Sequence, residues 1–151
     1  MTPGAAAVVP RFRLIDSTLR DGSHAISHQY TEADVISIVT GLDQSGIPVI
    51  EIAHGDGLGG SSFNYGFSLV DEKKLIAKAV ETAQQAKIAC LLLPGIAVAD
   101  DLRDVHELGV QVARIAVHCT EADITEQHIK LAKELDMEAI GFLMMSHMST
   151  P

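Results

Sequence analysis

The sequence has few of the features that mark proteins for export, for membranes or for nucleic acid. It contains no tryptophan, 4% aromatic residues and two cysteines. Lysine and arginine are scattered, so the chain lacks the basic stripe that nucleic acid requires. Cys90 and Cys119 are far apart in sequence, match no C-x-x-C spacing and lie in apolar runs typical of strands. We therefore expect buried thiols in a reducing cytosol rather than a disulfide.

The first ten residues are small and apolar, and they match no targeting segment. They lack a positively charged region, and their apolar run is too short for export or for spanning a bilayer. We expect residues 1–10 to form a disordered leader. The expected location is the cytoplasm, with neither a membrane nor a nucleic acid as partner.

Length and composition favour one soluble domain. A chain of 151 residues with 47% hydrophobic and 21% charged residues is long enough for one hydrophobic core, and two domains are not expected. The formal net charge of −9 aids solubility and says little about the fold.

Short apolar runs alternate with longer amphipathic segments along the chain. The short runs are rich in Val, Ile and Leu, as in parallel strands covered on both faces. Thr31 and Asp34 have the spacing of a helix cap. The expected strands are 11–16, 49–53, 88–93, 113–118 and 139–145. The expected helices are 31–46, 71–86, 98–108 and 124–135.

This order predicts an α/β protein of one of two kinds, an open doubly wound sheet or a (β/α)₈ barrel. Closed barrels typically need about 250 residues and at least about 200. On length alone, an open sheet of five strands is favoured.

Polar side chains follow each expected strand at its carboxyl end, where α/β proteins carry their active sites. Five such ends with polar groups indicate one shared site. The candidates are Asp16, Arg20, Asp21 and His24 after the first strand, Glu51, His54 and Asp56 after the second, the Leu-Pro-Gly segment 93–95 after the third, His118 and Cys119 after the fourth, and Ser146 and His147 after the fifth.

The segment Asp-Ser-Thr-Leu-Arg-Asp-Gly-Ser-His at 16–24 is the most informative of these. It places a cation, an oxygen ligand and a titratable base within a few residues, which suits a metal site for an oxo-acid. The simpler alternative is that Asp16 and Asp21 cap a turn and that Arg20 pairs with a surface acid.

The remaining histidines and the glycine-rich loop 54–67 give weaker signals. We expect His28, His106 and His128 to face solvent, and leave His54 open between loop scaffold and function. The loop lacks the G-K-[ST] ending of a P-loop. Its three aromatic residues indicate a flap over a site or against a partner, with a structural Ω-loop as the alternative.

Thr-Leu-Arg-Asp-Gly at 18–22 resembles the signature of metal-dependent TIM-barrel lyases and synthases that share an Asp-Arg-Glu site. His24 discriminates among them, because Claisen-type synthases typically place Gln there. The whole pattern from about residue 11 to 151 resembles the 4-hydroxy-2-oxovalerate aldolase family. The motifs are Arg-Asp-Gly-Ser-His-Ala at 20–25, Glu-Ile-Ala-His-Gly-Asp-Gly-Leu at 51–58, Gly-Ser-Ser-Phe-Asn-Tyr-Gly-Phe at 60–67, Leu-Leu-Leu-Pro-Gly at 91–95, His-Cys-Thr-Glu-Ala-Asp at 118–123 and Gly-Phe-Leu-Met-Met-Ser-His-Met at 141–148.

This resemblance replaces the open sheet with a (β/α)₈ TIM barrel. It implies that residues 11–151 are the N-terminal part of a pyruvate-carboxyltransferase-like domain, with the first five strands and four helices. It also implies cleavage of 4-hydroxy-2-oxovalerate, or a close homologue, to pyruvate and acetaldehyde or propionaldehyde in aromatic or steroid catabolism. A divalent metal, usually Mn²⁺, would act as Lewis acid.

The resemblance also implies a role for each site residue. Asp21 is the expected metal ligand, and Arg20 the group that stabilises the pyruvate enolate. His24 is the expected base for the 4-hydroxyl proton, and Glu51 holds Arg20. Leu91 and Leu93 share one face of their strand and are expected to border the aldehyde pocket.

The chain departs from the family in length, since members are about twice as long. Their His-x-His metal ligands, an aldehyde-site tyrosine and the helices that contact an acylating acetaldehyde dehydrogenase lie beyond this sequence. His147 fits the family's fifth-strand motif and does not replace those ligands. We expect the chain alone to be unstable or self-associating, and inactive.

Two other functions stay open at this stage. One is a Claisen-type synthase or acyl-CoA lyase of the same superfamily, against which His24 and the aromatic loop argue. The other is a non-catalytic remnant that serves as an interaction module. Metal titration separates the remnant from an aldolase, because a remnant need not bind Mn²⁺.

Overall fold

The computed structural model describes residues 12–150 as a curled parallel sheet with helices on one side. The leader predicted for residues 1–10 lies outside the described residues. The strands are β1 (Ile15–Asp16), β2 (Val49–Glu51), β3 (Lys87–Leu92), β4 (Val112–His118) and β5 (Glu138–Met144). The helices are α1 (Glu32–Gln44), α2 (Glu72–Thr82), α3 (Ala99–Glu107) and α4 (Thr125–Glu134), with short 3₁₀ turns η1 (Asp21–Ile26), η2 (Cys119–Ile124) and η3 (Ser146–Met148).

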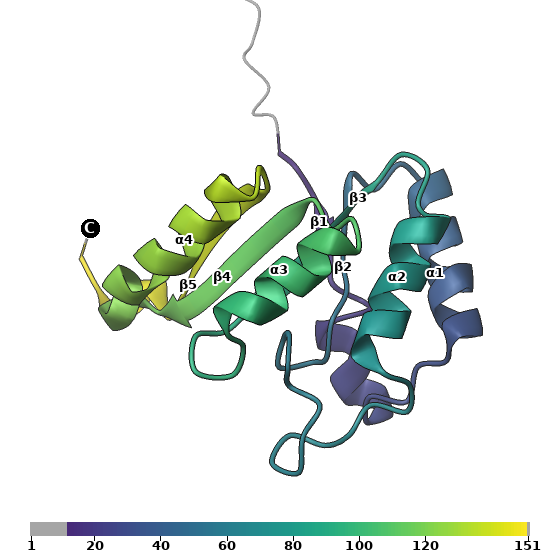
Figure 1. The fold of residues 1–151 in the computed structure, drawn as a ribbon, viewed down its shortest axis with the longest axis horizontal. Coiled ribbons are helices and arrows are strands. Elements are labelled where there is room, and N and C mark those ends of the chain that lie inside the picture. The colour runs from purple at the N-terminus through teal and green to yellow at the C-terminus, as the bar shows by residue number, and fades with distance from the viewer. Residues whose placement is uncertain (1–11, 151) are drawn as a thin grey trace, which may run out of the picture.

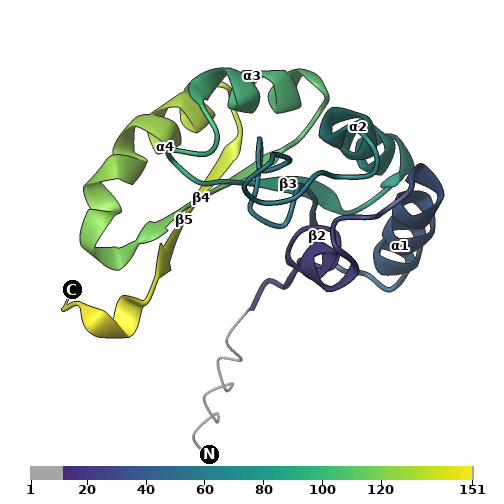
Figure 2. The same cartoon turned by 90° about the horizontal axis from the view of Figure 1, so that it is seen from below.

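The strands follow one another in the sheet in the order β1-β2-β3-β4-β5, all parallel. Figures 1 and 2 show the four helices as an outer arc around the strands. An open doubly wound sheet would instead reverse its strand order and carry helices on both faces. The partial barrel expected from the resemblance is therefore confirmed, and the open sheet favoured by length is wrong.

The curl of the sheet brings distant parts of the chain together across its concave side. The guanidinium of Arg13, just before β1, donates through Nη1 to Oε2 of Glu138 at the start of β5, at 2.9 Å. These two residues are 125 positions apart in sequence. This ion pair thus spans the curl of the sheet, from the segment before β1 to the start of β5.

The first strand is shorter than expected. Of the predicted range 11–16, only Ile15 and Asp16 pair with β2, opposite Val49 and Ile50. The residues just before them carry exposed apolar side chains, with Phe12 82% exposed. In this register Leu14 would lie opposite Pro48, which has no N–H to donate to a longer strand.

Local sequence signals explain the helix ends. Thr31 and Asp34 form the predicted capping box at the start of α1, because each side chain accepts a hydrogen bond from the other residue's backbone N–H. Asp71 caps α2 by accepting from the N–H of Lys74. Gly109 follows α3 with a φ of 98°, a left-handed conformation that glycine adopts without strain.

Alternate residues of each strand face opposite layers. The large apolar core lies between the sheet and the helices, and it includes Ile50, Leu92 and Ile115. The concave side has a much smaller apolar cluster around Val49, Ala89 and Val112. Side chains further along the strands on this concave side are free to build a site.

Asp43 at the end of α1 ties the helix layer to the entrance of β3. Its carboxylate accepts hydrogen bonds from the backbone N–H groups of Ala86 at 2.6 Å, Gln85 at 2.9 Å and Gln84 at 3.3 Å. These bonds, led by those from Ala86 and Gln85, lower the pKa of Asp43 against the opposing effect of burial.

No helix in residues 12–150 is both long and apolar enough to cross a membrane.

Candidate functional site

A cleft opens on the concave side of the sheet, at the carboxyl ends of the strands. Its volume is about 410 Å³. It combines charged groups from the turn after β1 with apolar groups from β3, β4 and β5. The lining residues are Arg20, Asp21, His24, Gly55, Asp56, Leu91, Leu93, Ala116, Phe142 and Met144.

Arg20 is held at this cleft by two acids. Its Nε donates to Oε2 of Glu51 at 2.8 Å, and its Nη1 donates to Oδ1 of Asp21 at 2.8 Å. The side chain of Glu51 is fully buried, whereas that of Asp21 is 65% exposed. The structure thus places Glu51 where the resemblance implied, as the acid that orients Arg20, and leaves the Asp21 carboxylate accessible.

A second arginine completes this network. Arg114 on β4 donates through Nη1 to Oε1 of Glu51 at 2.7 Å. Its guanidinium also lies over the ring of Phe142, 4.7 Å from the centroid, where a cation–π attraction is favourable. One buried carboxylate therefore joins two cations and orients both guanidinium groups.

His24 lies on η1 at the mouth of the cleft, with an exposed side chain. The backbone of Gly55 packs directly against its ring, because a Cβ on Gly55 would stand 2.5 Å from Cε1 and Nε2 of His24. The glycine thus provides the space in which the ring reaches the cleft beside Arg20.

Leu91 and Leu93 both line the cleft, as their alternation on the third strand predicted. Leu91 is 3% exposed and Leu93 half-buried. With Phe142 and Met144 from β5, they form the apolar wall opposite the charged groups.

Asp16 caps a turn, which is the simpler of the two roles that the sequence offered for it. Its Oδ1 accepts a hydrogen bond from the backbone N–H of Thr18 at 2.9 Å, which caps the turn after β1. It does not line the cleft.

His54, left open by the sequence, is a scaffold for the glycine-rich loop. Its Nδ1 accepts from the backbone N–H of Asp56 at 3.1 Å, and its Nε2 donates to the carbonyl of Gly66 at 3.1 Å. Burial, then the nearby His28, lowers its pKa, so the neutral ring that these bonds require is favoured.

Glu72 secures the same loop from α2. Its two oxygens accept from the backbone N–H groups of His54 at 2.8 Å and Gly59 at 3.0 Å. Burial raises its pKa more strongly than these hydrogen bonds lower it. The aromatic residues of the loop are exposed, with Phe63 at 92%, and none lines the cleft, so a flap closed over the site is not what the structure shows.

Two histidines expected to face solvent are buried, and that prediction was wrong for them. His28 packs under the glycine-rich loop, stacked on His54 with ring centroids 3.8 Å apart. His128 lies on α4, and its Nδ1 has no hydrogen-bond partner among the described residues. His106 on α3 is half-buried.

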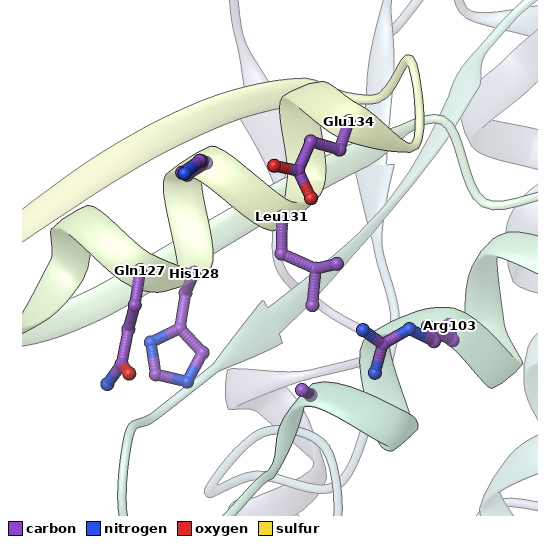
Figure 3. A pocket seen from close by; sticks show the side chains of 7 residues that line it. Arg103, Gln127, His128, Leu131 and Glu134 are labelled. Carbon is purple, nitrogen blue, oxygen red and sulfur yellow. The ribbon is translucent and has the colours of Figure 1, made fainter.

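Figure 3 shows where His128 lies, in a second hollow between α3 and α4. The hollow has a volume of about 310 Å³ and is lined by Arg103, Gln127, Leu131 and Glu134 among others. It belongs to the outer helical layer, away from the strand ends. It contains none of the groups that the sequence marked for catalysis.

The remaining strand-end groups are separate from the cleft. His118 accepts from the backbone N–H of Thr120 and so caps η2, and His147 is exposed on η3. Both cysteines are free, as predicted, and burial raises the pKa of Cys90 well above its usual value. Cys119, however, is half-buried in η2 rather than buried in a strand.

The sequence missed Arg114 and Phe142 as parts of the site, whereas it marked Asp56 as a strand-end candidate. Arg114 carried a usable signal, since it is a lone charge inside an apolar strand, two positions before Ala116 on the same face. Phe142 gave none, because an apolar strand residue has no mark that distinguishes a site wall from core.

The model of the family described as HMGL-like matches residues 11–151. The chain belongs to the HMGL-like family. The solved N-terminal domain of a putative aldolase from Bacteroides vulgatus has the same fold, with a TM-score of 0.70 at 18% identity over 86% of this chain and 44% of that one. The carboxyl transferase domain of Rhizobium etli pyruvate carboxylase gives a TM-score of 0.67 at 18% identity, over 85% of this chain and 24% of that one.

Relatives of known name point to one branch of the family. 4-Hydroxy-2-oxovalerate aldolase 6 of Rhodococcus jostii is 58% identical over 92% of this chain and 39% of its own length. The enzyme of the same name from Geobacillus genomosp. 3 is 57% identical over 92% of this chain and 41% of its own length. The resemblance drawn from the motifs is thereby confirmed, and this chain spans about two fifths of the length of these aldolases.

The donor groups at the cleft fit part of a divalent metal site. Asp21 offers an exposed carboxylate with one oxygen left unbound by Arg20, and hard oxygen ligands suit Mn²⁺ or Mg²⁺. Among residues 12–150, Asp21 is the residue for which the resemblance implies metal binding.

Proposed function

We propose that this chain forms the first half of the active site of a metal-dependent aldolase. The substrate is 4-hydroxy-2-oxovalerate or a close homologue, and the products are pyruvate and acetaldehyde or propionaldehyde. The observation that carries the proposal is Arg20, fixed by the buried Glu51 at a cleft whose mouth also holds Asp21 and His24. The names of relatives at 55–60% identity support it.

Arg20 stabilises the charge that develops in the reaction. When the C3–C4 bond of the substrate breaks, negative charge accumulates on the pyruvate enolate oxygen. Arg20 is 9% exposed and held by two acids, so its guanidinium is oriented before the substrate arrives. Preorganised donors of this kind contribute about 10²–10³ in kcat.

His24 takes the proton from the 4-hydroxyl group. Its ring lies at the mouth of the same cleft, packed on Gly55, and a neutral imidazole can accept a proton as a general base. Leu91 and Leu93 border the space for the aldehyde product.

Mn²⁺, held in part by Asp21, would polarise the 2-oxo group of the substrate as a Lewis acid. The proposed setting is cytoplasmic catabolism of aromatic compounds or steroids. An acylating acetaldehyde dehydrogenase, which consumes the aldehyde, is the proposed partner of a full-length member of the family.

The isolated chain is proposed to be inactive. One metal ligand at an exposed position binds Mn²⁺ weakly, and β5 presents exposed apolar side chains, including Phe142 at 37% and Leu143 at 40%. Unpaired strand edges and such patches favour self-association.

The test is pyruvate release from 4-hydroxy-2-oxovalerate in the presence of Mn²⁺. We expect no turnover by the chain alone, and turnover when the remaining part of the Rhodococcus jostii aldolase is added. Robust turnover by the chain alone would contradict the proposal that it forms only the first half of the active site. Acetyl-CoA-dependent condensation by the mixture, without pyruvate release, would instead favour a Claisen-type synthase.

A further inference from the structure

Three side chains beside the cleft gather in an arrangement of which the proposed aldolase reaction uses one member. They are His24 on η1, His28 just after it and Asp56 in the glycine-rich loop, and we call them the His-His-Asp cluster. One ligand atom from each lies within 4.8 Å of the others. The rings of His24 and His28 meet edge to face with centroids 5.0 Å apart.

We propose that the His-His-Asp cluster is a second metal site, separate from Asp21, that binds Zn²⁺ or a similar transition-metal ion. Two imidazoles and one carboxylate are a common ligand set for these metals, whereas Mg²⁺ and Ca²⁺ prefer oxygen ligands. The Asp21 carboxylate is not part of the cluster.

The surroundings of His28 are those of a metal ligand. Its Nδ1 lies 3.0 Å from Oγ of Ser23, a buried hydroxyl. Metal binding through Nε2 requires the proton on Nδ1, where the ring donates to Ser23, and would replace the hydrogen bond that the ring makes with the backbone of Tyr65. A metal-bound histidine almost always donates its other N–H to a fixed oxygen in this way.

His54 positions the cluster without joining it. Both of its nitrogens bind backbone groups of the loop, and its ring stacks on His28 at 3.8 Å. This stacking fixes the plane of His28. The hydrogen bond from the backbone N–H of Asp56 to His54 also holds the loop in place at Asp56, whose carboxylate is the third member of the cluster.

The cluster is close to ligand geometry and is accessible. Tetrahedral Zn²⁺ with bonds of about 2.0–2.1 Å places its ligand atoms about 3.3 Å apart. The separations of up to 4.8 Å therefore need to shorten by a small side-chain movement. His24 is exposed and both His24 and Asp56 line the cleft, so these two can close on the metal while the buried His28 stays in place.

Binding at this cluster has a consequence for His24. A metal on its nitrogen uses the lone pair that would take a proton, so Zn²⁺ would inhibit a reaction in which His24 is the base. This consequence rests on the proposed function, whereas the metal site itself does not. Direct metal titration therefore tests the site even if the reaction is a different one.

The experiment is a Zn²⁺ titration of the full 151-residue chain, free of any histidine tag, in competition with a chromophoric chelator. We expect one Zn²⁺ per chain. His28→Gln and Asp56→Asn should each weaken binding at least about tenfold. The matched controls Asp21→Asn and His106→Gln should leave the affinity within about twofold, since neither residue belongs to the cluster.

A further control tests Cys119, because its thiol lies near a histidine and cysteine thiolates bind Zn²⁺. Cys119 Sγ lies 4.0 Å from Nδ1 of His118, so Cys119→Ser tests whether Zn²⁺ binds there instead. Loss of binding in Cys119→Ser, or in Asp21→Asn, with full affinity in Asp56→Asn would overturn the proposal. Should His28→Gln fail to fold by circular dichroism, Asp56→Asn and His24→Gln decide, because both side chains reach the cleft.

Discussion

On the two faces of the sheet, adjacent residues of the same strand have different roles. On β3, Leu92 points into the core beneath the helices and is 0% exposed, while its neighbour Leu91 lines the cleft. On β2, Ile50 packs in the same core, while Glu51 holds two arginines. The helix-facing side is continuous apolar packing, and the concave side is a charged network.

The two faces differ in how much they contribute to the stability of the fold. Burying apolar side chains stabilises the fold by about 25 cal/mol per Å². Burying Glu51 with Arg20 and Arg114 gives little net stability, because desolvation offsets the attraction between the charges. The network on the concave side is therefore better explained by the orientation of Arg20 than by stability.

The largest expected effect comes from breaking that network. Glu51→Ala leaves two arginines without their shared carboxylate and should lower the free energy of unfolding by about 3–5 kcal/mol. Glu51→Gln, which keeps the shape, should lower it less. Urea denaturation of both variants measures this. Equal losses would mean that the charge of Glu51 does not matter.

A matched pair on β3 tests the comparison of faces directly. Leu92→Ala opens a cavity in the closed core and should destabilise by about 2–5 kcal/mol. Leu91→Ala should destabilise by less than half as much, since the space it leaves opens onto the cleft. Urea midpoints for the two variants decide. A larger effect for Leu91→Ala would reverse the comparison.

The carboxylate of Asp43 gives the helix-facing side a dependence on pH. Its pKa is lowered in the folded state by hydrogen bonds from Ala86 and Gln85, so its contribution to stability is present above the unfolded value of about 3.9 and is lost as the pH falls through the folded value. Asp43→Asn should therefore be less stable than the parent at pH 7.

The difference between Asp43→Asn and the parent should shrink below about pH 4. Urea midpoints at pH 7, 5, 4 and 3 measure it. Taking the difference between the two proteins cancels the titration of other acids. A gap that stays constant with pH would show that the hydrogen bonds of Asp43 do not depend on its charge.

The smallest effect is expected in the glycine-rich loop. Phe63 is 92% exposed and contributes nothing to the cleft lining, so Phe63→Ser should change stability by no more than about 0.5 kcal/mol. A thermal melt measures this. A clear loss of stability would show that the ring packs against the body of the protein in solution.

The sequence predicted the helix-facing side better than the concave side. All four helices and five strands lie where periodicity placed them, within a few residues, because period and capping are local properties. The pair Arg20 and Glu51 was anticipated through the motif. Arg114 was not, because its partner is 63 residues away and only the curl of the sheet brings the two together.

The burial of His28 and His128 was missed for a related reason. A histidine in a polar segment has no local signal for burial, and His28 is covered by a loop that begins 26 positions later in sequence. The length argument for an open sheet also failed, because a chain can hold part of a barrel wall and still follow barrel topology.

The central claim is that the concave cleft, rather than the hollow between the helices, carries the chemistry. Two arginines test it in the chain joined to the remaining part of the Rhodococcus jostii aldolase. Arg20→Ala should lower the kcat of pyruvate release at least about 100-fold, while Arg103→Ala, in the hollow of Figure 3, should change it by no more than about twofold. Full activity of Arg20→Ala in a folded protein would contradict the claim.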